Sequence, residues 1–159
     1  MMLEGSCHCR AVRFSVESKT PSPYMHCYCS ICRKTAGGGG FAINLGGDAE
    51  TLVVRGKRHL RIYRARLADG GESLAERRFC GRCGSALWVW SARWPELLHP
   101  FASAIDTPLP APPERCHIMV EFAPGWVRIP PSGKRDPHFA GYPDQSIEDW
   151  HRSRDLFDP

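Results

Sequence analysis

The sequence predicts a mainly β domain, a sandwich or a barrel with short helices. Two observations support this fold class. Short segments of alternating or β-branched apolar residues recur along the chain between turn residues, whereas helix signals occur in only two places. The length of 159 residues, of which 42% are hydrophobic, fits one domain that can bury its own core.

The strand signals follow one another in chain order. The first candidate alternates apolar and polar residues, the second is a β-branched run, and the next two flank the turn residues Asp69 and Gly70, which is typical of a hairpin. The remaining candidates are apolar runs. We expect strands at Ala11–Val16, Leu52–Val54, His59–Leu67, Ser73–Phe79, Ala86–Trp90, Leu98–Ile105 and Cys116–Phe122.

Two helices are expected, one early and one late in the chain. The first covers Ser30–Ala36 and is stopped by the glycine run 37–40. The second covers Trp150–Leu156 and is preceded by a capping signal in which Ser146 is followed three residues later by Asp149. Between the last strand and this helix, the proline-rich stretch Gly125–Pro143 is expected to wrap the domain surface as an ordered extension.

The start of the chain and its charges restrict the compartment and the partners. Residues 1–7 have no basic or apolar stretch typical of a signal peptide, and no apolar run approaches the ~18 residues of a membrane helix. We therefore expect a cytoplasmic protein without membrane contact. The formal net charge is +4, but the basic residues are scattered, which does not favour nucleic-acid binding.

Cysteine is the residue type that points to chemistry. Disulfides do not persist in the reducing cytosol, and two cysteines two positions apart do not bridge easily. Metal ligation explains the spacing better, because residues i and i+2 of a strand share a face. Of the eight cysteines, Cys116 stands alone and seven form three clusters, Cys7-x-Cys9, Cys27-x-Cys29-x-x-Cys32 and Cys80-x-x-Cys83.

The clusters divide naturally into a closed and an open metal site. Two pairs, such as Cys7/Cys9 with Cys80/Cys83, make the four-thiolate tetrahedron of a structural zinc site. The three remaining cysteines provide three ligands and a vacancy, as in a catalytic zinc site, unless His26, His8 or Cys116 closes it. Seven thiolates and two Zn²⁺ would reduce the formal net charge of +4 to about +1.

The motifs around these cysteines resemble those of a known family. The matching stretches appear in the same order over about residues 3–130: Gly5–Cys9, His26–Lys34, the glycine run into Phe41, Phe79–Leu87, and His117–Val120 followed by Trp126. They are similar to the motifs of the glutathione-dependent formaldehyde-activating enzyme family, which is often grouped with the centromere protein V domain.

The resemblance implies a fold, two metals and an activity. The fold is of the β-tent type, a zinc-bound β-sandwich of twisted antiparallel sheets, here over residues 1–130 with 131–159 as an extension packed on the same domain. The resemblance implies a structural zinc on Cys7, Cys9, Cys80 and Cys83, and a catalytic zinc on Cys27, Cys29 and Cys32.

The implied activity is that of a carbon–sulfur lyase or synthase. It forms or cleaves the S-hydroxymethyl adduct of glutathione, or a similar thiol, with formaldehyde or another aldehyde. The alternative is a non-catalytic zinc module that binds protein partners. The cysteine triplet favours the enzyme, because a structural protein gains nothing from three thiolates around a vacancy. Neither the substrate nor the oligomeric state follows from the sequence.

Overall fold

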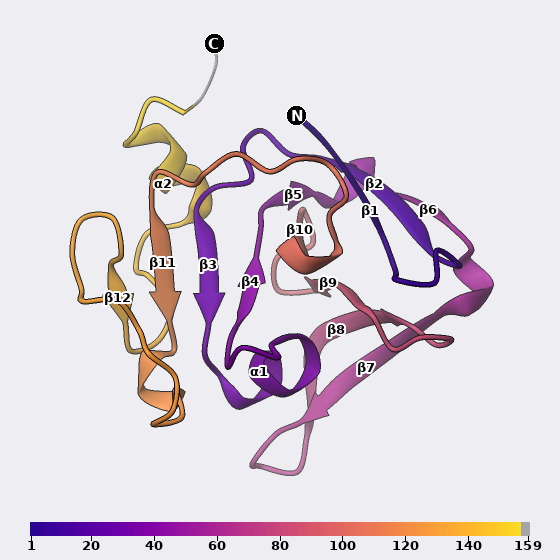
Figure 1. Cartoon of the computed structure of the whole chain (residues 1–159), viewed down its shortest axis with the longest axis horizontal. Helices are drawn as coiled ribbons and strands as arrows, with labels where there is room; N and C mark the ends of the chain where they lie inside the picture. The colour runs from indigo at the N-terminus through magenta and orange to yellow at the C-terminus, as the bar shows by residue number, and fades with distance from the viewer. Residues whose placement is uncertain (157–159) are drawn as a thin grey trace.

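The computed structural model describes residues 1–156 and has three β-sheets and two α-helices. Helix α1 (Ser30–Ala36) lies near the end of β3 (Tyr24–Cys27) and the start of β4 (Ala42–Asn44) (Figure 1). The three-stranded sheet has the order β1 (Met2–Ser6), β2 (Arg13–Glu17) and β6 (Val53–Arg55). The predicted mainly β fold with short helices is therefore confirmed.

The other two sheets carry the candidate site. The five-stranded sheet has the order β5 (Gly47–Asp48), β10 (Leu97–Pro100), β9 (Ala86–Ser91), β8 (Glu72–Cys80) and β7 (Leu60–Arg66). The four-stranded sheet has the order β12 (His138–Phe139), β11 (Arg115–Ile118), β3 (Tyr24–Cys27) and β4 (Ala42–Asn44). Pairing is antiparallel except at β11, which runs parallel to both β3 and β12.

Short helices connect these strands. The α-helices are α1 (Ser30–Ala36) and α2 (Ile147–Arg152). Four 3₁₀ turns lie at η1 (Ala49–Thr51), η2 (Lys57–His59), η3 (Ala102–Ala104) and η4 (Val120–Phe122). Over residues 1–156, neither helix has the length and apolar character needed to cross a bilayer.

The core consists of two apolar clusters. The larger one joins the three-stranded and five-stranded sheets, and Phe14 packs on Trp88 with ring centroids 5.0 Å apart. Gly5 is required here, because a Cβ atom at this position would lie 2.4 Å from the Phe14 ring. The smaller cluster surrounds α1 and includes Cys27, Cys32 and Cys116. The cysteines therefore lie inside the packed interior as well as at its edge.

Several predicted elements are found where the sequence placed them. Helix α1 has the expected bounds. Strands β7 and β8 pair as a hairpin, and Leu67 N–H donates to the Gly71 carbonyl at 2.8 Å across the predicted turn. The late helix is capped by Ser146, whose hydroxyl accepts from Asp149 N–H at 3.0 Å, but it begins at Ile147 rather than Trp150 and ends at Arg152.

Two predicted strands are too long. The strand expected over Leu98–Ile105 ends at Pro100, because Ala104 N–H bonds back to the Phe101 carbonyl at 2.9 Å and forms a 3₁₀ turn. The strand expected over Cys116–Phe122 ends at Ile118, because Met119 adopts a left-handed conformation with φ 58°. Local turn bonds therefore interrupt two apolar runs that alternation alone would continue.

Candidate metal centres and the adjoining cavity

Four cysteines from two distant parts of the sequence lie close together in the structure. The sulfur atoms of Cys7, Cys9, Cys80 and Cys83 all lie within 4.8 Å of one another. The Cys9 sulfur is 3.6 Å from that of Cys7 and 3.8 Å from that of Cys80. We call these residues the four-cysteine cluster. Its spacing and donor set fit a single tetrahedral ion with thiolate ligands.

Tight turns bring these sulfurs together. The expectation that Cys7 and Cys9 share a strand face is wrong, because β1 ends at Ser6 and both residues lie in a turn that Arg10 closes with φ 57°. Cys80 ends β8, and Gly84 N–H bonds to its carbonyl at 2.8 Å. Backbone N–H groups of Val12 and Arg82 point at the sulfurs of Cys7 and Cys80, an arrangement that stabilises thiolates.

A second group, the cysteine triad, lies where β3 meets α1. The sulfurs of Cys27, Cys29 and Cys32 lie within 4.8 Å of one another. Cys27 is the last residue of β3, Cys29 is the N-cap of α1, and Cys32 lies in the first helical turn. The Cys29 sulfur accepts from Cys32 N–H at 3.3 Å.

Proton sharing within the triad fits a cation-binding site. Hydrogen bonds from Cys27 and Cys32 hold the pKa of the Cys29 thiol far below its ordinary value, to about 2. The pKa of Cys27 is raised because it donates to Cys29 and Cys32 and is buried. The three sulfurs thus carry fewer than three negative charges by themselves, and a divalent cation would replace the remaining protons.

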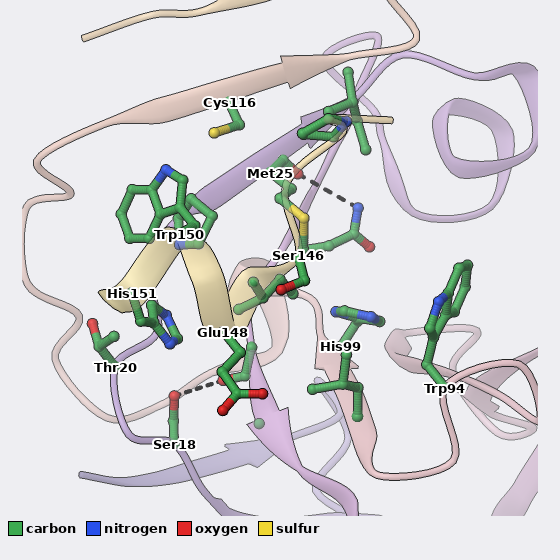
Figure 2. A pocket seen from close by; sticks show the side chains of 18 of the residues that line it. Ser18, Thr20, Met25, Trp94, His99, Cys116, Ser146, Glu148, Trp150 and His151 are labelled. Carbon is green, nitrogen blue, oxygen red and sulfur yellow. Dashed lines mark hydrogen bonds between the residues drawn. The ribbon is translucent and has the colours of Figure 1, made fainter. Parts of the chain in front are cut away.

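The triad faces a large cavity, and the four-cysteine cluster does not. The cavity has a volume of about 1800 Å³ and is lined by Cys27 and Cys32 but, among the described residues, by none of Cys7, Cys9, Cys80 and Cys83. Figure 2 shows part of its wall, where the N-cap residue Ser146 and the α2 residues Glu148 and Trp150 lie across the space from Trp94 and His99. A molecule in this cavity can therefore reach the triad.

Arg77 is a cavity residue that the sequence analysis missed. It lies on β8, is only 8% exposed, and its Nη2 donates to the Cys32 sulfur at 3.7 Å. The Nε and Nη1 atoms are buried without a hydrogen-bond partner. The sequence signal was weak, because the predicted hairpin is rich in arginines, and others of them, such as Arg64 and Arg78, pair with Glu76.

A buried polar network begins at Tyr28, between two cysteines of the triad. The Tyr28 hydroxyl lies 2.8 Å from His117 Nδ1, and His117 Nε2 lies 3.2 Å from Asp136 Oδ1. Burial raises the pKa of Tyr28 to about 12 and lowers that of His117, so the phenol donates to a neutral imidazole that in turn donates to Asp136. The network was not predicted from the sequence, which places its three members far apart.

The other residues considered as site candidates take different positions. His26 stacks on Phe41 with ring centroids 4.8 Å apart, as expected for a residue facing away from Cys27. Cys116 is buried and lines the cavity. Within residues 1–156, no histidine, carboxylate or further cysteine joins the triad, so neither His8, His26 nor Cys116 closes it.

Comparisons with known proteins agree with this architecture. Residues 2–121 match the family model described as "Glutathione-dependent formaldehyde-activating enzyme". The chain is 65% identical over 151 residues to a Halomonas elongata protein named "Putative glutathione-dependent formaldehyde-activating enzyme", with 95% of each chain covered. It is also similar to a crystal structure of a Rhodobacter sphaeroides protein, with a TM-score of 0.53, 28% identity, and coverage of 67% of this chain and 91% of the other.

Proposed function

The chain belongs to the glutathione-dependent formaldehyde-activating enzyme family, and from this premise we propose that it is a zinc-dependent carbon–sulfur lyase or synthase. It joins glutathione, or a similar small thiol, to formaldehyde or another aldehyde in the cytoplasm, or cleaves the S-hydroxymethyl adduct. The proposed ligands are Cys27, Cys29 and Cys32 for a catalytic Zn²⁺, and the four-cysteine cluster for a structural Zn²⁺.

One observation carries the proposal: of the two cysteine groups, the one with three members opens on the cavity. Three thiolates leave one position of a tetrahedral ion open to a substrate, whereas four close it. Cys27 and Cys32 line the cavity, and the four-cysteine cluster lies outside it. A Zn²⁺ at the triad would supply a coordination site that favours the thiolate form of a thiol substrate.

The remaining parts of the site position and shield the reactants. The cavity walls include apolar and aromatic side chains, such as Val89, Trp94 and Phe139, which exclude water from a bound thiol. The polar network through Tyr28 fixes the loop between Cys27 and Cys29, so that the triad keeps one geometry. In adduct formation the thiol sulfur bonds to the aldehyde carbon, and the carbonyl oxygen gains the proton that the thiol loses.

Cys29→Ser tests the assignment of the triad. We expect the variant to fold, to lose one of two zinc ions per chain and to lose adduct formation from glutathione and formaldehyde above the spontaneous rate. Zinc is counted by atomic emission on purified protein, and adduct formation is followed by proton NMR. Unchanged zinc content would overturn the three-ligand assignment.

Cys116→Ser is the matched control, because Cys116 is a buried cavity thiol outside the triad. It is expected to keep both zinc ions. If the wild-type protein holds two zinc ions but leaves the spontaneous rate unchanged for every thiol and aldehyde offered, the proposed enzymatic function is wrong. A single, tightly held zinc ion would instead favour a non-catalytic module that binds other proteins.

A further inference from the structure

Arg77 carries a buried positive charge for which the fold supplies no carboxylate. In the part of the chain that the structure describes, the one hydrogen bond of its guanidinium goes to the Cys32 sulfur, and the guanidinium forms no ion pair. The neighbouring arginine Arg78 behaves differently, because it pairs with Glu76. A buried charge without hydrogen bonds to all its donors is costly, so an unpartnered guanidinium at a cavity calls for a functional reason.

The position of Arg77 on β8 directs it to the cavity. Alternate residues of a strand share a face, and both Ala75 and Arg77 line the cavity. Its cross-strand neighbour on β9, Val89, lines the cavity as well. Arg77 thus belongs to the same wall as the triad, surrounded by small and apolar side chains that strengthen any electrostatic contact it makes.

The distance to the triad restricts what the guanidinium can bind. Its Nη2 atom is 3.7 Å from the Cys32 sulfur. A substrate sulfur that reaches the triad therefore lies near the guanidinium, and an anionic oxygen that Arg77 contacts is only a few bonds from that sulfur. The carboxylates of glutathione are many bonds from its sulfur. The oxygen of the aldehyde, two bonds from the sulfur once the adduct forms, fits this position.

We propose that Arg77 is a catalytic residue that binds the oxyanion produced when a thiolate adds to the aldehyde carbon. As the sulfur–carbon bond forms, the π electrons of the carbonyl move to its oxygen, which becomes an alkoxide and then takes up, through water, the proton that the thiol lost on becoming a thiolate. In the reverse direction the hydroxyl returns its proton to water, the carbonyl re-forms and the sulfur–carbon bond breaks. Charged donors aimed at such an oxygen stabilise the transition state. This inference rests on the proposed function.

A binding experiment tests the anion site without turnover. Mercaptoacetate and ethanethiol share the HS–CH₂ group. On that carbon mercaptoacetate carries a charged carboxylate, whereas ethanethiol carries a methyl group. Their dissociation constants are measured by calorimetry on zinc-loaded protein. We expect wild type to prefer mercaptoacetate by about tenfold or more, as a hydrogen-bonded charge provides, and Arg77→Gln to remove this preference. Ethanethiol binding should change less than about threefold, because it offers no anion for Arg77.

Two further variants keep the test decisive. Arg78→Gln changes the adjacent arginine, which pairs with Glu76, and is expected to retain the preference. Arg77→Lys keeps the positive charge but loses the planar arrangement of guanidinium donors, so part of the preference for mercaptoacetate should remain. If Arg77→Gln does not fold, the comparison is made with Arg77→Lys instead. An unchanged preference in the Arg77 variants would show that Arg77 only balances the charge of the cysteine thiolates, and would overturn the proposal.

Kinetics separate this proposal from the proposed function. In an active enzyme, Arg77→Gln is expected to lower kcat by about 100-fold, as loss of an oxyanion donor does, with the KM for the thiol nearly unchanged. A rise in KM at constant kcat would overturn the catalytic role and leave only substrate binding. If wild type produces no adduct but binds mercaptoacetate through Arg77, the enzymatic function and the oxyanion role are both wrong, and only an anion site remains.

Discussion

At the scale of single residues, Tyr28 shows how the triad is held. It stands between the ligand candidates Cys27 and Cys29, yet it points away from the cavity and into a buried hydrogen-bond chain with His117 and Asp136. The rings of Tyr28 and His117 are also stacked, with centroids 5.8 Å apart. Because polar groups buried this deeply need partners, the chain fixes the conformation of the loop that carries the first two triad sulfurs.

Tyr28→Phe is expected to destabilise the protein by removing one end of this chain. His117 is 1% exposed, so its Nδ1 atom would be left without a partner in the core. Such a loss costs about 1–3 kcal/mol in the free energy of unfolding, which urea denaturation measures.

Tyr24→Phe provides the comparison for this measurement. The Tyr24 hydroxyl donates to the Pro110 carbonyl at 2.8 Å, and Pro110 is exposed, so water can replace the lost donor. Its expected cost is about 0.5–1.5 kcal/mol. If Tyr28→Phe costs no more than Tyr24→Phe, the network does not hold the triad in the way described.

Residue spacing predicted two cysteine pairs and a triplet suited to metal ligation, and the family resemblance implied which of them share an ion. The intervals within each cluster limit the distance between its own sulfurs, whereas the meeting of Cys7 and Cys9 with Cys80 and Cys83 depends on the fold. Arg77, His117 and Asp136 could not be assigned in this way. Their roles depend on burial and on contacts between distant segments, and neither is visible in a sequence whose surface also carries many arginines and carboxylates.

At the scale of elements, the C-terminal segment is built into the cavity wall. The parallel strand β12 lies beside β11, and the His151 ring bonds to the Ser22 carbonyl at 2.7 Å. Glu114 accepts two hydrogen bonds from Arg154, at 2.6 and 2.8 Å, and one from Trp150. We propose that residues 131–159 form an extension of the domain whose described part completes the substrate cavity.

Glu114→Ala is expected to loosen α2. The substitution removes the acceptor of Trp150 and of both Arg154 bonds, and a partly buried, hydrogen-bonded charge pair of this kind is worth about 1.5–3 kcal/mol. Amide hydrogen exchange over Ile147–Arg152, read by mass spectrometry, should become about tenfold faster, which corresponds to about 1.4 kcal/mol.

Glu148→Gln is the control for this effect. Within residues 1–156, the ion pair of Glu148 is with the exposed Arg152 on the same helix, the two side chains being 61% and 63% exposed, and such pairs contribute little. Exchange over α2 should be nearly that of wild type. Equal acceleration in both variants would show that the helix is held by its own surface pairs rather than by Glu114.

Elements with strong local signals were predictable, and elements made by tertiary pairing were not. The hairpin of β7 and β8 has turn residues and alternation, and α1 has a glycine stop, so both were found. Strand β12 has two residues and is defined by its backbone pairing with the edge of β11. The parallel pairing of β11 with β3 joins segments about 90 residues apart, which no local pattern could specify.

At the scale of the whole molecule, the four-cysteine cluster connects two sheets. Cys7 and Cys9 follow β1 of the three-stranded sheet, whereas Cys80 ends β8 of the five-stranded sheet. Cys7 and Cys80 also belong to the larger apolar core. An ion at this position would therefore hold together the two layers that enclose most of the buried apolar surface, whereas the triad lies within a single sheet and its neighbouring helix.

This difference predicts that loss of a ligand cysteine affects folding differently at the two sites. A structural zinc ion contributes about 10–16 kcal/mol to folding, which equals or exceeds the ~5–15 kcal/mol by which whole domains are stable. Cys80→Ser is therefore expected to abolish the cooperative thermal transition seen by circular dichroism, because Cys80 is fully buried and its site joins the two layers.

Cys29→Ser should keep that transition with a lowered midpoint, since the triad is not needed to join the layers. A chelator should remove the two ions one after the other. The ion at the triad, which has an open position, leaves first with the fold intact, and unfolding begins only when the ion of the four-cysteine cluster is removed. If Cys80→Ser melts as cooperatively as wild type, the four-cysteine cluster does not stabilise the fold through a metal ion, and packing alone joins the sheets.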